Sequence, residues 1–272
     1  MEGELCADLH IHTRASDGVM DLADVVKVAA HTGLSAVAVT DHDRLHPELD
    51  ARICHVDGIE VIHGIEIRVR FAETRVDLLG YGVRPTPELD DLLRSIQQSR
   101  IDRAGHMIAS LERALDVSID LIPSVGIGRP EIAAAVVDTT EYDSTDRVFD
   151  ELIGEDCRHY VPRWVPDART AIDALRGAGA LIGLAHPSRY AQMDTATAIV
   201  DDIDAIEAYY PYVRQPGEQT DPARIEQIAA RAGVVVTGGS DAHDRELGKA
   251  GLDVDRFRSF REALTEAGRR TA

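Results

Sequence analysis

The feature that most constrains the fold of this chain is a set of short apolar segments that each run into histidine or aspartate. Four such segments are spread along the sequence, and apolar stripes with helical spacing lie between them. Short β-branched segments are typical of buried strands, and their alternation with helices predicts a parallel α/β fold. Parallel strands end at one edge of a sheet, so we expect the polar ends to lie together. These ends are His10, His12 and Asp17; Asp41 and His42; His186; and Asp241 and His243.

The first of these ends carries a His-x-His pair. Alternate residues of a strand share a face, so His10 and His12 point the same way while Leu9 and Ile11 point into a core. A surface strand can also carry two histidines, so the pair alone is a weak signal of a metal site. The repetition of His and Asp at four strand ends indicates a polynuclear metal site.

Two further carboxylates interrupt apolar strands. Glu66 lies in the predicted strand 60–67, and Asp77 lies in the predicted return strand 75–81 of a hairpin. A buried carboxylate needs a partner. For Glu66 that partner is either a bridging metal ion or a salt bridge to Arg68 or Arg70, and the sequence leaves both open.

The middle of the chain has a different character. Residues 85–166 contain helical patterns over 89–115 and 129–137 and no alternating strand pattern, which predicts a mostly helical insertion between barrel segments 1–84 and 167–272. Arg129 stands at a helix start, where amide donors and a guanidinium can hold phosphate. Arg189 follows His186 and is a second candidate for phosphate binding. An ordinary solvated arginine is the alternative for Arg129.

The composition limits the partners of this chain. It has 48 acidic and 29 basic residues, a net charge of −19, and only Lys27 and Lys249 as lysines. Such a surface repels long nucleic acids. No apolar run reaches the roughly 18 residues of a membrane span. The cysteines Cys6, Cys54 and Cys157 form no pair motif, and we expect a soluble, cytoplasmic protein with reduced thiols.

The acidic, lysine-poor composition also suggests adaptation to high salt, where screening removes self-repulsion. Under this hypothesis the melting temperature rises between low and molar salt. An unchanged or lower melting temperature would contradict it, and the chain would then be an ordinary acidic protein.

Together the motifs resemble the PHP (polymerase and histidinol phosphatase) superfamily of metal-dependent phosphoesterases. The resemblance covers nearly the whole chain, and the insertion resembles the branch of nucleotide phosphatases and short-oligonucleotide hydrolases. It implies a distorted (β/α)7 barrel with two to three divalent ions (Mn, Zn or Fe) at the carboxyl ends of the strands. The motifs are His10-x-His12, Asp17-Gly18, Thr40-Asp41-His42, Gly64-Ile65-Glu66, Ala185-His186-Pro187 and Ser240-Asp241-Ala242-His243.

The resemblance also implies the ligands and the reaction. One ion would bind His10, His12, Glu66 and Asp241; a second Asp17, His42 and His243; a third Glu66, Asp77 and His186. Asp17, His42, His186 and His243 would be catalytic in the hydrolysis of a phosphomonoester of a small nucleotide, a nucleoside mono- or 3′,5′-bisphosphate, by metal-activated hydroxide. The general acid is either His186 or a metal-bound water. Long nucleic acids and membranes are not expected as partners.

The chain departs from the family pattern at two positions. Family members usually carry histidine where this chain has Asp77, and often where it has Glu131. The first change favours harder ions such as manganese or weakens the third site. The second alters a substrate contact. The alternatives are a 5′-3′ exoribonuclease acting on short oligonucleotides, a histidinol phosphatase, and a non-catalytic metal-binding regulator. An amidohydrolase is disfavoured, because neither lysine stands at a strand end.

Overall fold

The computed structural model describes residues 4–211 and 222–270 of the chain. The chain divides into two compact units. The first consists of Met1–Leu92 and Pro166–Ala272, and the second of Leu93–Val165.

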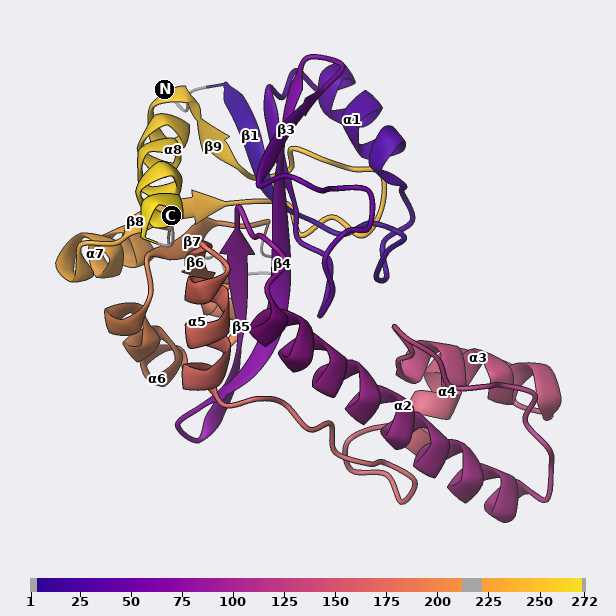
Figure 1. The fold of residues 1–272 in the computed structure, drawn as a ribbon. Helices are drawn as coiled ribbons and strands as arrows, with labels where there is room; N and C mark the ends of the chain where they lie inside the picture. The colour runs from indigo at the N-terminus through magenta and orange to yellow at the C-terminus, as the bar shows by residue number, and fades with distance from the viewer. Residues whose placement is uncertain (1–3, 212–221, 271–272) are drawn as a thin grey trace. The chain divides into compact units, whose positions relative to one another are not determined.

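A mixed β-sheet curls through the first unit (Figure 1). Its strand order is β8-β7-β6-β5-β4-β2-β1-β9, and β3 pairs with β4 outside this path. Parallel pairing of Ile11 with Ala242, just beyond β8, joins the two sides of the sheet. The distorted (β/α)7 barrel expected from the sequence is confirmed. The strands are β1 (Leu5–Ile11), β2 (Ala36–Val39), β3 (Ile53–Val56), β4 (Ile59–Phe71), β5 (Thr74–Tyr81), β6 (Leu181–Leu184), β7 (Ala205–Tyr209), β8 (Val235–Gly238) and β9 (Leu252–Asp253).

One strand causes the distortion. β5 is antiparallel to both of its neighbours, β4 and β6, whereas β1 with β2, β2 with β4, β6 with β7 and β7 with β8 are parallel. A tight connection at residues 72–73 turns β4 directly into β5, so a hairpin replaces one β-α-β unit. The polar ends of the parallel strands still reach one edge of the barrel.

Helices of the first unit pack along the outside of the sheet (Figure 1). Aspartate side chains cap three of them, with Asp21, Asp167 and Asp253 accepting backbone N–H bonds in the first turn. The predicted helix over 221–231 is α7, and Asp221 itself lies outside the described residues. The helices are α1 (Leu22–His31), α5 (Ala168–Gly177), α6 (Met193–Thr197), α7 (Pro222–Ala232) and α8 (Val254–Arg269), with 3-10 turns at Pro187–Arg189 and Ala198–Asp202.

The second unit is helical, as expected. Its helices pack around buried residues such as Met107, Leu111 and Ile132. The long helix α2 (Pro87–Leu115) begins in the first unit and continues into the second. The others are α3 (Arg129–Thr139), α4 (Thr145–Val148) and a short π-helix at Phe149–Ile153. Within residues 4–211 and 222–270, none of the helices combines the length and the apolar character needed to cross a membrane.

Two strands of the structure, β3 and β9, were not predicted from the sequence. β3 contains the polar residues Cys54 and His55, and β9 has only two residues, so neither shows the apolar run or alternation that marks a strand. Both exist because an adjacent strand pairs with them, β4 with β3 and β1 with β9. β4 also extends past the predicted residue 67, because β5 pairs along it as far as Phe71.

A buried histidine on β4 predicts how stability depends on pH. His63 is 1% exposed, and neither ring nitrogen has a hydrogen-bond partner among the described residues. Burial, helped by His46, lowers the pKa of His63 to about 4. The unfolded chain, with an ordinary pKa of about 6.5, therefore binds a proton first as the pH falls. We expect this site to remove up to about 3 kcal/mol of stability as pH drops from about 6.5 to about 4.

Unfolding midpoints measured from pH 8 to pH 4 check this expectation. A His63→Leu variant should show a flatter loss of stability over that window than the wild type. The exposed His55 on β3 offers a matched control, and His55→Gln should retain the wild-type slope. Equal slopes in all three proteins would contradict the role of His63.

Candidate metal centre

The ends of the parallel strands bring the predicted site residues together. β1 supplies His10 and leads into His12, and the segment after β2 pairs with β4 so that His42 lies beside Glu66. The Ala185 amide donates to the Asp77 carbonyl, which places His186 beside β5. Pairing of Ile11 with Ala242 sets Asp241 and His243 next to the end of β1. Backbone pairing between strands therefore assembles the centre.

Three of the four side chains in the first set are buried. His10, His12, Glu66 and Asp241 place one nitrogen or oxygen each within 4.8 Å of one another. His12 Nε2 lies 3.0 Å from Asp241 Oδ1 and 3.3 Å from Glu66 Oε2. His10 Nε2 lies 3.4 Å and 3.5 Å from the same two oxygens. Two imidazoles and two carboxylates thus face a common point away from solvent, a donor set that suits a divalent transition metal.

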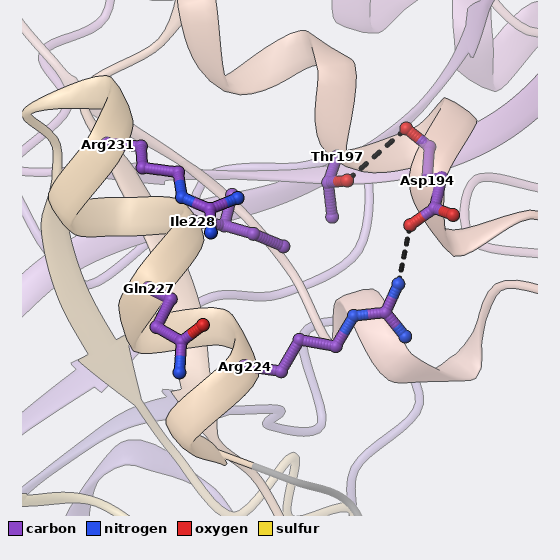
Figure 2. A pocket seen from close by; sticks show the side chains of 6 residues that line it. All are labelled: Asp194, Thr197, Arg224, Gln227, Ile228 and Arg231. Atoms are coloured by element: carbon purple, nitrogen blue, oxygen red, sulfur yellow. Dashed lines mark hydrogen bonds and ion pairs between the residues drawn. The ribbon is translucent and has the colours of Figure 1, made fainter.

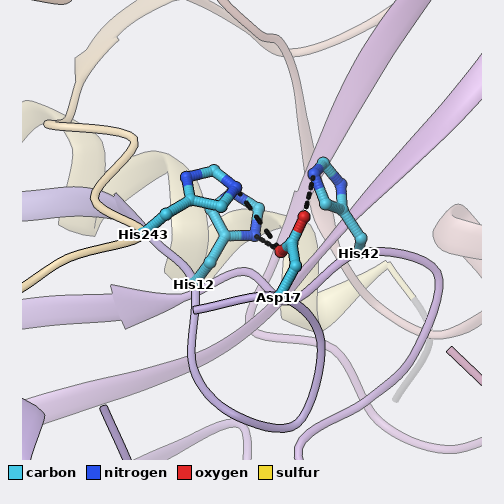
Figure 3. Close-up of side chains that lie close together, drawn as sticks. All are labelled: His12, Asp17, His42 and His243. Atoms are coloured by element: carbon cyan, nitrogen blue, oxygen red, sulfur yellow. Dashed lines mark ion pairs between the residues drawn. The ribbon is translucent and has the colours of Figure 1, made fainter. Parts of the chain in front are cut away.

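The second set lies closer to solvent. Figure 3 shows the Asp17 carboxylate between the rings of His42 and His243, with His12 beside it. Asp17 Oδ1 lies 3.4 Å from His243 Nε2, and its Oδ2 lies 3.7 Å from His42 Nε2. The side chain of Asp17 is 51% exposed, against 10% for Asp241 in the first set. Solvent therefore reaches the centre from the side of Asp17.

The third set shares a residue with the first. Glu66 Oε1 lies 3.2 Å from His186 Nε2, which lies 3.7 Å from Asp77 Oδ2. The sequence left a salt bridge from Glu66 to Arg68 or Arg70 open. In the structure Arg68 pairs with Asp77, and Arg70 lies 3.7 Å from Asp167. Glu66 instead faces histidines from several strands, and His42 Nδ1 is 2.9 Å from its Oε2.

Several buried polar atoms of the centre have no hydrogen-bond partner among the described residues. They are His10 Nε2, both ring nitrogens of His12, Glu66 Oε2 and His186 Nδ1. Burial of a polar atom without a partner costs free energy, and such atoms rarely gather in one place. A divalent ion coordinated by the first set would satisfy three of these residues at once. The residues of the first and second sets therefore fit the ions that the motifs imply.

The electrostatics of the centre are dominated by close opposite charges. Burial alone lowers the pKa of His12, but the carboxylates of Asp241 and Glu66 outweigh it and raise this pKa to about 9. Burial would raise the pKa of Asp17, yet His243 and His42 hold it well below its usual range. The contacts between carboxylates and imidazoles thus stabilise the charged forms of both kinds of group. A metal ion would replace these contacts with coordination bonds.

Two buried aspartates support the loops that carry the ligands. Asp41 accepts hydrogen bonds from the Thr13 amide and hydroxyl at 2.8 Å each and from the Ser16 hydroxyl at 2.7 Å. This fixes the loop that presents Asp17. Asp8 accepts from the Ser240 amide at 2.9 Å and the Ser240 hydroxyl at 2.6 Å. It therefore anchors the segment that presents Asp241, and burial raises the pKa of Asp8.

Close backbone approach and positive φ angles also mark this edge. A Cβ atom on Gly239 would lie 2.4 Å from both the backbone nitrogen and the Cβ of His10, so glycine is required where β8 meets β1. His186 and Asp241 adopt left-handed backbone conformations, with φ of 31° and 50°. Such conformations are uncommon outside glycine and persist where the surrounding structure enforces them. Here they aim two side chains into the centre.

Glu207 is a site residue that the sequence analysis missed. It lies on β7, is fully buried, and its Oε1 is 3.2 Å from His10 Nδ1. Its Oε2 accepts a 2.8 Å hydrogen bond from the His186 amide. A carboxylate between apolar residues of a buried strand, the signal that singled out Glu66, was also present at Glu207. Glu207 leaves His10 Nε2 to face the first set and so orients the ring.

Replacement of Glu207 by glutamine is expected to weaken metal binding. A neutral amide orients His10 less firmly, and loss of such a supporting carboxylate typically costs about 10- to 100-fold in metal affinity. Competition with a chelating dye measures the change. Glu226→Gln is the matched control, since Glu226 lies on α7 and contacts Tyr209 and Arg256 rather than the centre. Unchanged affinity in Glu207→Gln would show that His10 needs no support from β7.

The two arginines predicted to bind phosphate have different surroundings. Arg189 is half-exposed, and its Nη1 lies 3.2 Å from the Tyr210 hydroxyl and 3.3 Å from Asp241 Oδ2, at the border of the first set. Arg129 belongs to the second unit, where its guanidinium stacks near the rings of Phe149 and Tyr160. Glu131 accepts a hydrogen bond from the Gly128 amide at 2.9 Å and so caps α3. Arg189 thus lies beside the predicted metal-binding side chains of the first unit.

A separate cavity of about 470 Å³ lies between α6 and α7 (Figure 2). Its charged residues include Asp194, Arg224 and Arg231, and Asp194 pairs with Arg224 at 2.7 Å. The residues that line it include none of the predicted site residues. The chemistry expected from the sequence is therefore concentrated at the strand ends.

Comparisons with known proteins identify a family, related sequences and a solved structure that are similar to this chain. The model of the family described as the PHP domain matches residues 8–156. The chain is 29% identical over 257 residues to the 3′,5′-nucleoside bisphosphate phosphatase of Chromobacterium violaceum, covering 91% of this chain and 90% of that protein. It is 30% identical over 189 residues to the 5′-3′ exoribonuclease of Haemophilus influenzae, covering 67% and 69%. A protein from Bifidobacterium adolescentis described as a metal-dependent phosphoesterase shares the fold, with a TM-score of 0.76 at 24% identity over 97% of this chain and 98% of that one.

Proposed function

The chain belongs to the PHP domain family, and from this membership and the site we propose that it is a metal-dependent phosphoesterase that hydrolyses a phosphomonoester of a small nucleotide. One observation carries the proposal. Glu66 lies at the meeting point of three groups of side chains, with Oε2 facing His10, His12 and His42 and Oε1 facing His186. A shared carboxylate of this kind is suited to hold two ions close together, the arrangement that two-metal phosphoryl-transfer sites use.

We assign the ligands by their grouping. His10, His12, Glu66 and Asp241 would hold one divalent ion, and Asp17, His42 and His243 a second. The mixture of imidazole nitrogens and carboxylate oxygens suits manganese, zinc or iron. Divalent ions in such a site supply Lewis-acid stabilisation of phosphoryl charge and lower the pKa of water.

The protein's own side chains would orient the substrate. Asp17, His42 and His243 stand at the solvent side of the centre, and His186 lies beside Glu66 at its inner side. Arg189 presents a half-exposed guanidinium next to Asp241, in position to bind a phosphate oxygen. We also propose Arg129 of the second unit as a phosphate contact, and His186 as a candidate to donate a proton to the leaving oxygen.

The relatives favour a nucleotide as substrate. The bisphosphate phosphatase aligns over most of this chain, and the exoribonuclease over about two thirds of it. The net charge of −19 opposes binding of long nucleic acids, whose phosphates it repels. We therefore propose a nucleoside monophosphate or 3′,5′-bisphosphate as substrate, with short oligonucleotide hydrolysis as the second candidate because of the exoribonuclease relative.

Phosphate release from a panel of substrates tests the proposal. The purified protein is incubated with manganese and with nucleoside monophosphates, 3′,5′-bisphosphates and 5′-phosphorylated oligonucleotides of two to five residues. We expect faster turnover of a mononucleotide or bisphosphate. Faster turnover of oligonucleotides would support the exoribonuclease instead. Metal binding with no turnover of any substrate would favour a non-catalytic regulator.

We further propose that the first unit is the catalytic domain and the second an inserted domain, and that the protein acts in the cytoplasm. Cys6, Cys54 and Cys157 are all unpaired in the structure, which fits a reducing compartment.

A further inference from the structure

We propose that Arg68 takes the place of a third metal ion, so that this chain holds two ions and uses a fixed guanidinium beside His186 to bind the substrate phosphate. The inference rests on the proposed function and deepens it. It concerns the third set, Glu66, Asp77 and His186, which the motifs imply as a metal site.

Asp77 is fully engaged by Arg68. The two residues are direct partners across the β4–β5 hairpin. Arg68 Nε donates to Asp77 Oδ1 at 2.7 Å, and Nη2 donates to Oδ2 at 2.8 Å. This bidentate geometry is the strongest form of an arginine–carboxylate pair. The Asp77 side chain is 3% exposed. The backbone N–H of Asp77 donates to the Tyr190 hydroxyl at 2.8 Å, so Tyr190 holds the backbone of Asp77 while Arg68 holds its side chain.

The charge at the third set does not fit a third divalent ion. Its anionic groups are Glu66 and Asp77. Glu66 also serves the first set through Oε2, and the charge of Asp77 is compensated by Arg68. An ion there would share one carboxylate with its neighbour, compete with two charge-assisted hydrogen bonds for the other, and stand close to a permanent positive charge. The first set, by contrast, offers two carboxylates and two imidazoles.

The Arg68 guanidinium can supply part of the positive charge that a metal ion would offer to a phosphate. It carries a permanent positive charge, and the pair with Asp77 uses only two of its five N–H groups. The Arg68 side chain is 47% exposed, so part of it can be reached from solvent. Asp77 Oδ2 lies 3.7 Å from His186 Nε2, which places this pair at the edge of the centre. A phosphate oxygen bound there would meet a planar donor in a fixed orientation.

Metal stoichiometry tests the first half of the inference. The wild type and Asp77→Asn are saturated with Mn²⁺, freed of excess ion and analysed by mass spectrometry for manganese per chain. We expect two ions in both proteins. Three ions in the wild type and two in Asp77→Asn would show that Asp77 is a ligand and would overturn the inference.

Binding of inorganic phosphate tests the second half. Calorimetry on the manganese-loaded protein compares the wild type with Arg68→Met, Arg68→Lys and Arg70→Met. Loss of a charge-assisted contact is expected to weaken phosphate binding about 10- to 100-fold in Arg68→Met, with partial recovery in Arg68→Lys. Arg70, two residues along the same strand and near Asp167, is the matched control and should bind phosphate as the wild type does. Equal affinity in Arg68→Met and Arg70→Met would overturn this half.

These measurements separate the inference from the proposed function. Two ions per chain together with phosphate binding that depends on Arg68, but no hydrolysis of any phosphomonoester, would leave the inference standing and contradict the function. Active enzyme with three ions per chain would do the reverse.

Discussion

Replacement of Glu66 by glutamine is expected to reduce phosphatase activity by at least about 1,000-fold, because metal ions contribute several kcal/mol of charge stabilisation to phosphoryl transfer. The glutamine keeps the size of the side chain and removes its charge. Glu66 is 1% exposed, and its Oε2 lies within 3.5 Å of nitrogens from His10, His12 and His42. No other residue of the centre faces as many ligands, so we expect the metal content to fall with the activity.

Steady-state kinetics and elemental analysis of the variant measure both effects. Glu60→Gln is the matched control, because Glu60 is a buried carboxylate on the same strand that pairs with Arg261 away from the centre. It should lose stability but keep its metal and its activity per folded molecule. Full activity and metal content in Glu66→Gln would contradict the assignment of the centre.

Removal of metal is expected to abolish activity and to lower the melting temperature. An ion present at 100 times its dissociation constant stabilises the folded state by about 2.7 kcal/mol. For a chain of this length that corresponds to a loss of roughly 5–10 °C for each ion removed. The buried side chains of the first set make the effect large, because carboxylates and imidazoles that lose an ion remain out of contact with water.

Dialysis against a chelator, followed by calorimetry and assay, tests this expectation. Addition of Mn²⁺ should restore both the melting temperature and the activity, whereas Ca²⁺, which prefers oxygen ligands, should restore them less. Asp17→Asn, which disturbs the second set, should respond less to chelation than the wild type. A melting temperature that ignores the chelator, in a protein shown to have lost its metal, would contradict a metal centre inside the barrel.

The local signals in the sequence were sufficient for the strands that carry the site. β1, β2, β6 and β8 are short and apolar, and each is followed by histidine or aspartate, so their existence and their polar ends could be predicted from composition and period. Glu66 was identifiable because a carboxylate between isoleucines needs a partner. The grouping into three sets came from the family resemblance, and the structure brings the same residues together.

Other features depended on pairing between distant residues. β9 has two residues and exists only beside β1, so it carries no signal of its own. Glu207 showed the same local pattern as Glu66, but its role became visible only where β7 placed it against His10. The partner of Arg68 was also undetermined, because Glu66 and Asp77 lie on adjacent strands and only the register decides which of them the guanidinium reaches.

The sequence by itself determined the chemical class of this chain: an α/β protein with histidine and aspartate at its strand ends and an excess of acidic residues. These properties are local or compositional, since strand period, polar ends and net charge need no knowledge of contacts. Only the tertiary structure decided that His42 also faces Glu66, that Glu207 contacts His10, and that Asp77 faces a guanidinium. Those outcomes depend on strand register and barrel closure, which bring together residues as far apart as His10 and Asp241.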